Sequence, residues 1–211
     1  MIRIAVLVSG KARGSTLGAL MDACRQREID GEIALVIGTK PETPALSRSN
    51  RSLVIEPGEN EEEYGAALLQ ALAKARIDLV CLAGYLRKLP SAVVAAYQGR
   101  IMNSHPSLLP AFGGRGMYGD RVHRAVVESG VKVSGCTVHF VDEEYDAGPI
   151  ILQLPVLTDP SESAEQWAQR LLPFEHDAYI ASVRLFAEKK LRLEGRRVLL
   201  DDRPGLEAST T

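Results

Sequence analysis

Short apolar runs alternate with amphipathic stretches along most of the chain. Residues 2–8 (IRIAVLV) are aliphatic apart from Arg3, which suits a strand buried on both faces. Similar runs recur at residues 32–37, 53–55, 78–83, 100–103 and 150–156. Between them, apolar residues repeat at helical spacing. This alternation predicts an α/β fold with a doubly wound, mostly parallel, Rossmann-like sheet.

The amphipathic stretches carry helix signals at their ends. Asn60 can cap a helix that runs to Arg76, and the acidic residues 61–63 suit its first turn. Shorter helices are predicted over residues 17–24, 91–97 and 120–129. A long amphipathic helix is predicted to begin near Ser161 or Ser163, and Pro173 is expected to kink or split it.

Two segments depart from the strand–helix alternation. Residues 132–141 alternate polar and apolar side chains, which predicts one strand antiparallel to the others. Residues 191–200 are typical of a small hairpin that turns at Glu194-Gly195. Since no repeat or linker is evident, residues 1–200 are predicted to form a single catalytic domain and residues 201–211 a frayed tail.

Net charge and cysteine use narrow the class of protein. The 211 residues carry a net charge of −2 with a pI near 6.1, so neither nucleic acid nor a membrane surface is favoured as a partner. No apolar stretch is long enough to span a bilayer, and the N-terminus leads into a strand pattern rather than a signal peptide. Three dispersed cysteines without CxxC spacing predict reduced thiols in a cytoplasmic protein.

Candidate chemistry lies in residues 103–110 (NSHPSLLP), at the end of a predicted buried strand. Asn103 and His105 alternate along extended backbone, so their side chains can project to the same side. Pro106 keeps His105 extended. A carboxamide can donate a hydrogen bond to a developing oxyanion, and an imidazole can move a proton near neutral pH. The stretch alone equally allows a strand-ending Asn that caps a turn beside a surface His.

A second candidate is the glycine-containing loop after the first strand, residues 9–16 (SGKARGST). A strand, a glycine loop and a helix form the geometry in which backbone N–H groups and the helix dipole bind an anion. Ser15 or Thr16 can serve as the helix N-cap, and Lys11 and Arg13 add positive charge. The loop matches neither a Walker A nor a GxGxxG motif, so an ordinary βα turn stays open as an alternative.

Another loop, residues 84–90, follows the fourth predicted strand. Tyr85, Leu86 and Leu89 can wall an apolar pocket there. Arg87 can serve as a carboxylate clamp or lie free on the surface as a cation.

Three stretches in this order resemble the formyltransferases that use 10-formyltetrahydrofolate: LAGYLRKL, NSHPSLLP and VSGCTVHFVDEEYDAGPI. The similarity runs from Ile2 to about Val198. It is greatest to the members that formylate glycinamide ribonucleotide in purine biosynthesis. The resemblance implies the formyltransferase fold, 10-formyltetrahydrofolate as co-substrate, no metal, and small molecules as the only substrates.

The resemblance also implies catalytic roles for Asn103, His105 and Asp146. In the family the substrate amine attacks the formyl carbon, and negative charge develops on the formyl oxygen. Asn103 would hydrogen-bond that oxygen, and His105 would stabilise the charge or relay a proton. Asp146 would either pair with His105 or position a water that carries the proton to the folate nitrogen.

Binding residues follow from the same resemblance. It implies contacts to the ribonucleotide from Gly14, Ser15, Thr16 and Glu175, the last holding the ribose hydroxyls. It implies a folate pocket made of Leu82, Tyr85, Leu86, Arg87, Leu89, His139, Val141 and Asp142. One departure concerns the phosphate loop, which in the family reads Ser-Gly-x-Gly-Ser-Asn. This chain has two extra residues there and Thr16 in place of the Asn, and Lys11 and Arg13 can compensate.

Other functions compatible with these residues are a formyltransferase for another acceptor, a formyltetrahydrofolate hydrolase, or a non-catalytic nucleotide- or folate-binding module. The joint presence of Asn103, His105 and Asp146 favours an enzyme. Glu175 and the glycine loop favour the ribonucleotide as acceptor. A chain that begins on the first strand and ends soon after the last helix also favours this acceptor over the longer relatives. We expect a monomer or a homodimer.

Overall fold

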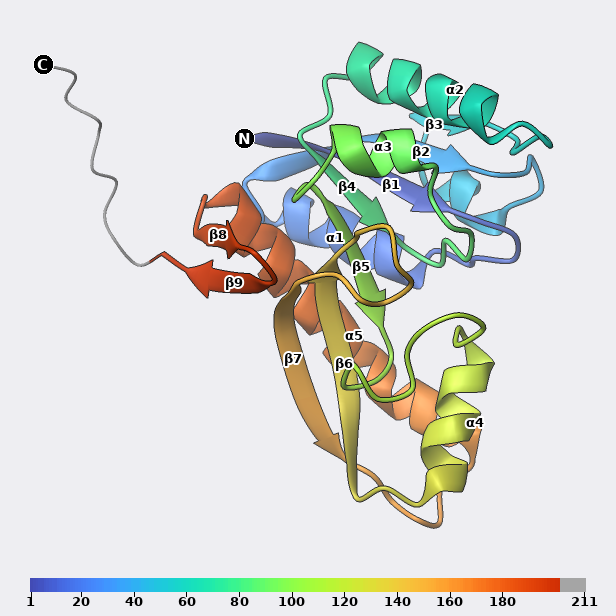
Figure 1. Cartoon of the computed structure of the whole chain (residues 1–211), viewed down its shortest axis with the longest axis vertical. Coiled ribbons are helices and arrows are strands. Elements are labelled where there is room, and N and C mark those ends of the chain that lie inside the picture. Colours follow the sequence, from blue (N-terminus) through green and yellow to red (C-terminus); the bar gives the residue numbers. More distant parts are fainter. Residues whose placement is uncertain (202–211) are drawn as a thin grey trace, which may run out of the picture.

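A single nine-stranded sheet forms the centre of the computed structural model, which describes residues 1–201 (Figure 1). Its strand order is β3-β2-β1-β4-β5-β6-β7-β9-β8. The strands are β1 (Ile2–Val8), β2 (Gly31–Gly38), β3 (Ser52–Val54), β4 (Leu79–Leu82), β5 (Ile101–His105), β6 (Val133–Phe140), β7 (Ile150–Leu157), β8 (Leu191–Glu194) and β9 (Arg197–Leu200).

Helices cover both faces of this sheet. They are α1 (Ser15–Arg25), α2 (Glu61–Lys74), α3 (Ser91–Ala96), α4 (Asp120–Ser129) and α5 (Ala164–Ala187), with a short 3₁₀ helix η1 (Pro44–Arg48). One apolar core lies between the sheet and α1, α4 and α5, and a second lies under α2 and α3. The predicted doubly wound, mostly parallel sheet is therefore confirmed.

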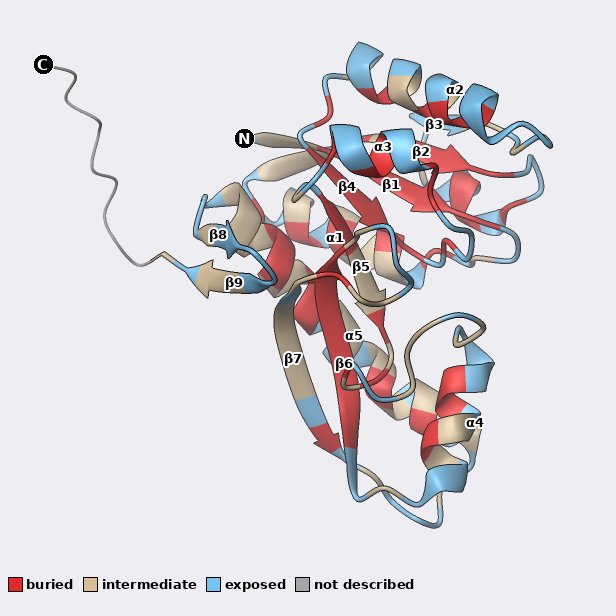
Figure 2. Ribbon diagram, viewed as in Figure 1, coloured by how far each residue is buried: buried red, intermediate tan, exposed pale blue. Residues whose placement is uncertain are grey.

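Strand β1 shows why its sequence is apolar on both sides. Ile4, Val6 and Val8 belong to the first core, whereas Ala5 and Leu7 belong to the second. Strands β4 and β6 are likewise buried along nearly their whole length (Figure 2). A strand between two helical layers needs apolar residues at consecutive positions.

The antiparallel part of the sheet begins at β6, as predicted. β6 pairs antiparallel with β5 and with β7. A second antiparallel strand, β8, comes from the C-terminal hairpin, which joins the sheet where β9 pairs parallel with β7 through Ile150 and Arg197. The hairpin was predicted from its own residues, but its attachment to the sheet was not.

Two expectations about local structure need correction or completion, and one short element was not predicted. Pro173 does not split the long helix, since α5 continues through it, held by buried Trp167, Leu171 and Tyr179 on either side. Ser163 is the N-cap of α5, in a capping box with Gln166. The helix η1 was not predicted, since five residues are too few to show a helical period.

The remaining expectations concern the chain's ends and the membrane. Apart from Asp201, the predicted tail of residues 201–211 lies outside the described residues. Across residues 1–201, we find no helix with the length and apolar character to cross a bilayer.

Candidate active site

Asn103 and His139 face each other across two neighbouring strands. They are partners in the antiparallel register of β5 and β6, so their side chains leave the sheet on the same face. Asn103 Nδ2 lies 3.3 Å from His139 Nε2. The register therefore brings the predicted catalytic amide directly against the predicted folate-site histidine.

The hydrogen bonds of His139 define its tautomer. Its Nδ1 lies 2.9 Å from the carbonyl oxygen of Phe140, which can only accept, so Nδ1 carries the proton. Burial lowers the pKa of His139, which favours the neutral ring. Nε2 is then an acceptor, and the group of Asn103 that faces it must be the NH₂. One of the two amide hydrogens of Asn103 is left for another acceptor.

Asp146 reaches both histidines from the turn that follows β6. Its Oδ2 lies 3.5 Å from Nδ1 of His105, and its Oδ1 lies 3.8 Å from Nε2 of His139. The N–H of Gly114 donates to Oδ2 at 2.9 Å. Asp146 has a positive φ of 53°, a conformation that few non-glycine residues adopt and that here directs the carboxylate toward β5.

His105 is enclosed by the loop that follows it. The side chain is almost fully buried, and Nε2 lies 2.8 Å from the carbonyl oxygen of Phe112. Because a carbonyl only accepts, Nε2 carries a hydrogen, and Nδ1 is the nitrogen that faces Asp146. The structure thus gathers the three predicted catalytic residues, with His139, at the end of β5.

A hydrogen-bond network that sequence reasoning missed supports the loop after β5. The hydroxyl of Thr137 donates to the carbonyl of Ser107 at 2.7 Å and accepts from the N–H of Leu109 at 3.0 Å. Gln153 donates to the carbonyl of Leu109 at 2.9 Å. The polar residues Thr137 and Gln153 within two predicted strands were the available signal.

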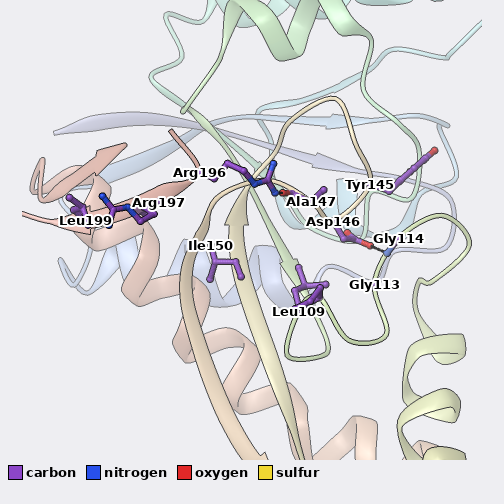
Figure 3. A pocket seen from close by; sticks show the side chains of 13 residues that line it. Leu109, Gly113, Gly114, Tyr145, Asp146, Ala147, Ile150, Arg196, Arg197 and Leu199 are labelled. Carbon is purple, nitrogen blue, oxygen red and sulfur yellow. Dashed lines mark hydrogen bonds between the residues drawn. The ribbon is translucent and has the colours of Figure 1, made fainter. Parts of the chain in front are cut away.

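A cleft with a volume of about 710 Å³ borders Asp146. Figure 3 shows Asp146 and Gly114 on one side of it and the C-terminal hairpin on the other. From that hairpin, Arg196 donates a hydrogen bond to the carbonyl of Ala147. Sequence reasoning assigned no role to this arginine, because its contact depends on how the hairpin attaches to the sheet.

The predicted phosphate loop ends at the start of α1. The N-cap is Gly14, with φ 78°, so neither Ser15 nor Thr16 caps the helix, and no side chain accepts a hydrogen bond from its first turn. In residues 1–201 no acceptor lies within hydrogen-bond distance of the N–H groups of Ser15, Thr16 and Leu17. These groups are available to an anion, as is usual for the first turn of a helix.

Glu175 lies half-buried on α5 and has no hydrogen-bond or ion-pair partner among residues 1–201. Burial raises the pKa of its carboxyl group to about 7. The neighbouring thiol of Cys136 has a pKa raised to about 12, chiefly by its own burial and to a smaller extent by the charge of Glu175. Glu175 is thus an unpaired acceptor on the face that α5 turns toward the sheet.

The predicted folate residues divide into packing residues and accessible ones. Leu82, Tyr85 and Leu89 belong to the core under α2 and α3, and the Tyr85 hydroxyl lies 2.9 Å from that of Tyr64. Leu86 and Arg87 are exposed, Val141 and Asp142 are half-buried, and His139 is buried. The structure does not, by itself, join these residues into one pocket, and their contacts with folate stay a prediction.

Ser9 connects the phosphate loop to the predicted folate segment. Its hydroxyl donates to the carbonyl of Gly84 at 3.1 Å and accepts from the N–H of Leu86 at 2.9 Å. The two loops therefore lie side by side at the ends of β1 and β4. Residues 1–201 contain no group of three or more His, Cys, Asp or Glu side chains that could hold a metal ion.

Comparison with known proteins places the chain in a family. The family model described as "Formyl transferase" matches residues 2–183. Chloroplastic phosphoribosylglycinamide formyltransferase of Arabidopsis thaliana is 39% identical over 197 residues, which are 90% of this chain and 67% of that protein. Phosphoribosylglycinamide formyltransferase of Escherichia coli (strain K12) is 34% identical over 95% of this chain and 94% of that protein.

Solved structures agree with the sequence comparison. Glycinamide ribonucleotide transformylase 1 from Symbiobacterium toebii superposes with a TM-score of 0.88 at 42% identity, covering 96% of this chain and 95% of that one. Some relatives are longer: the chain spans 62% of the chloroplastic Vigna unguiculata enzyme and 13% of the trifunctional purine biosynthetic protein of Drosophila melanogaster. The chain belongs to the formyl transferase family and, within it, to the phosphoribosylglycinamide formyltransferases.

Proposed function

We propose that this enzyme transfers the formyl group of 10-formyltetrahydrofolate to the primary amine of glycinamide ribonucleotide, a step of purine biosynthesis. The observation that carries the proposal is the convergence of Asn103, His105 and Asp146 at the end of β5, with 3.5 Å between the Asp146 carboxylate and the His105 ring. Relatives named for this activity support the choice of substrate.

Asn103 is suited to bind the formyl oxygen. When the amine attacks the formyl carbon, negative charge develops on that oxygen, and a fixed N–H donor lowers the energy of the charged species. His139 occupies one amide hydrogen of Asn103 and fixes the rotation of the carboxamide. The second hydrogen can then point at the substrate without reorganisation during the reaction.

His105 and Asp146 are suited to handle charge and protons. A proton on His105 Nδ1 gives an imidazolium, which stabilises the same negative charge and faces the Asp146 carboxylate. As the new C–N bond forms and the bond to the folate nitrogen breaks, the amine loses a proton and the folate nitrogen gains one. Asp146 can accept that proton or hold a water that carries it.

Two groups outside the catalytic residues are suited to bind the phosphate and the ribose of the ribonucleotide. The free N–H groups at the start of α1 suit its phosphate, and the unpaired carboxylate of Glu175 can accept two ribose hydroxyl donors. Folate is proposed to bind the predicted segment from Leu82 to Leu89, together with His139, Val141 and Asp142.

Three free cysteines support a cytoplasmic location. A monomer or homodimer stays a prediction.

Formyl transfer from 10-formyltetrahydrofolate to glycinamide ribonucleotide tests the proposal, followed as loss of the folate formyl group. We expect turnover with this acceptor and losses of roughly 100-fold or more in Asn103→Ala, His105→Ala and Asp146→Ala. Asp30→Ala is the control, because Asp30 is exposed and pairs with the N-terminus. Release of formate to water, or turnover with another amine alone, would contradict the choice of acceptor.

A further inference from the structure

We propose that Arg48 binds the phosphate group of the ribonucleotide, a role that rests on the function proposed above. Arg48 ends the 3₁₀ helix η1, far from the phosphate loop in sequence. It was not among the residues that the sequence indicated. Three features of the structure support this role: the attachment of η1 to the loop, the position of the guanidinium, and the donors of Arg48 that are unused.

The first observation is that η1 attaches to the part of the loop that is longer than the family pattern. The N–H of Ala45 donates to the carbonyl of Ala12 at 3.0 Å. Nε of Arg48 donates to the carbonyl of Arg13 at 2.9 Å. The additional length of residues 9–16 thus provides two neighbouring backbone acceptors, which hold η1 and the Arg48 side chain against the loop.

The second observation is that the Arg48 side chain crosses the first turn of α1. A Cβ on Gly14 would lie 2.9 Å from Cδ and 3.0 Å from Nε of Arg48. A Cβ on Gly18 would lie 3.3 Å from Nη1. Glycine at both positions therefore lets the guanidinium approach the helix start, where the N–H groups of Ser15, Thr16 and Leu17 have no acceptor in the described chain.

The third observation is that most donors of Arg48 are unused. Only Nε makes a hydrogen bond, and none of the described carboxylates pairs with the guanidinium. A cation against the positive end of a helix is unfavourable unless an anion lies between them. The planar Nη donors match phosphate oxygens, and the anchored stem loses less entropy on binding than the free side chains of Lys11 and Arg13.

These observations explain how the chain can bind phosphate with Thr16 where the family has Asn. The loop donates backbone N–H groups from one side, and Arg48 supplies charge and two further donors from the other. Lys11, Arg13 and Arg48 are all exposed, but of these three only Arg48 forms a hydrogen bond through its side chain within residues 1–201. Lys11 and Arg13 are less suited than Arg48 to a fixed site.

The test compares glycinamide ribonucleotide with its dephosphorylated nucleoside as formyl acceptors. We expect Arg48→Ala to raise KM for the ribonucleotide roughly 10- to 100-fold and to leave kcat/KM for the nucleoside unchanged. Arg48→Lys should recover only part of the loss, because an ammonium lacks the fork of donors. If Arg48→Ala does not fold, Arg48→Lys is compared with wild type for both acceptors instead. Arg25→Ala, at the exposed end of the same helix, is the control.

The outcomes separate the two proposals. Equal losses with both acceptors would mean that Arg48 only supports the loop, and would overturn this inference. The inference would also be overturned if KM for the ribonucleotide were unchanged in Arg48→Ala but raised in Lys11→Ala or Arg13→Ala. Both results leave the proposed function standing. Wild-type enzyme that fails to formylate the ribonucleotide would overturn the proposed function and this inference together.

Discussion

The hydroxyl of Tyr179 lies 2.8 Å from the carbonyl oxygen of Met102, the residue that precedes Asn103 on β5. The same hydroxyl lies 3.1 Å from the carbonyl oxygen of Leu82, the partner of Asn103 on β4. Tyr179 is fully buried, one helical turn after Glu175 on α5. One helix therefore carries the proposed ribose acceptor and also fixes the strand ends that position the catalytic amide.

Tyr179→Phe should lower both stability and turnover. The substitution removes the hydroxyl that links the carbonyls of Leu82 and Met102, at a cost of about 1–3 kcal/mol in the free energy of unfolding. Urea denaturation measures that cost. We expect kcat to fall while KM for either substrate changes less, because the strand end that moves carries Asn103. Tyr97→Phe is the control, since the Tyr97 hydroxyl has no hydrogen bond to residues 1–201. An unchanged kcat in Tyr179→Phe would contradict the positioning role.

Asn103→Asp should be as damaging as Asn103→Ala, although it conserves the shape of the side chain. A carboxylate facing Nε2 of neutral His139 would set an acceptor against an acceptor and leave no donor for the formyl oxygen. We expect kcat to fall roughly 100-fold or more. Steady-state kinetics of both variants, with thermal unfolding to verify folding, measures the effect. Near-normal turnover in Asn103→Asp would contradict the proposed donor role.

Most of the fold followed from local patterns. Buried parallel strands consist of apolar runs because both of their faces are covered. The predicted capping residues Asn60 and Ser163 are the N-caps of α2 and α5 in the structure. The attachment of the hairpin at Ile150 and Arg197 could not be predicted, because a single parallel pair leaves no pattern in either strand. Helix α5 tolerates Pro173 because tertiary packing outweighs local propensity.

The candidate site was predictable only in part. The alternation of Asn103 and His105 is local, so these two of the three proposed catalytic residues could be placed on one side of the strand from sequence alone. The approach of Asp146 depends on the positive φ at that residue and on a turn between two long strands. The position of His139 opposite Asn103 depends on strand register, and that of Arg48 on the contacts between η1 and a distant loop. Such contacts between distant segments leave no periodic signal.

Gly148→Ala should disturb the Asp146 turn. A Cβ at position 148 would lie 1.8 Å from the carbonyl oxygen of Phe140, a backbone atom that can move only by distorting β6. We expect the free energy of unfolding to fall by about 1–3 kcal/mol, and turnover to fall even where the variant is folded. Gly58→Ala is the control, because its Cβ would meet only the backbone nitrogen of Asn60 at 4.0 Å. Equal activity of the two variants would show that Asp146 does not depend on this close contact.

The raised pKa of Glu175 predicts a pH-dependent stability. Burial raises this pKa from 4.5 to about 7, so between these values the folded chain binds a proton that the unfolded chain has released. Stability is therefore lost as the pH rises through this range, by at most about 3 kcal/mol for a half-buried carboxyl group. Glu175→Gln removes the titration. Its Tm should match wild type near pH 5 and exceed it near pH 8, by thermal unfolding.

The same titration should control ribonucleotide binding in the opposite direction. Only the ionised carboxylate of Glu175 can accept hydrogen bonds from both ribose hydroxyls, so KM for the ribonucleotide should fall as the pH rises from 6 to 8. In Glu175→Gln this KM should be higher, by roughly 10-fold, and should lose that pH dependence. Glu188→Gln, at the C-terminal end of the same helix, is the control and should keep the wild-type profile. A pH profile that survives in Glu175→Gln would assign the titration to another group and contradict the ribose-binding role of Glu175.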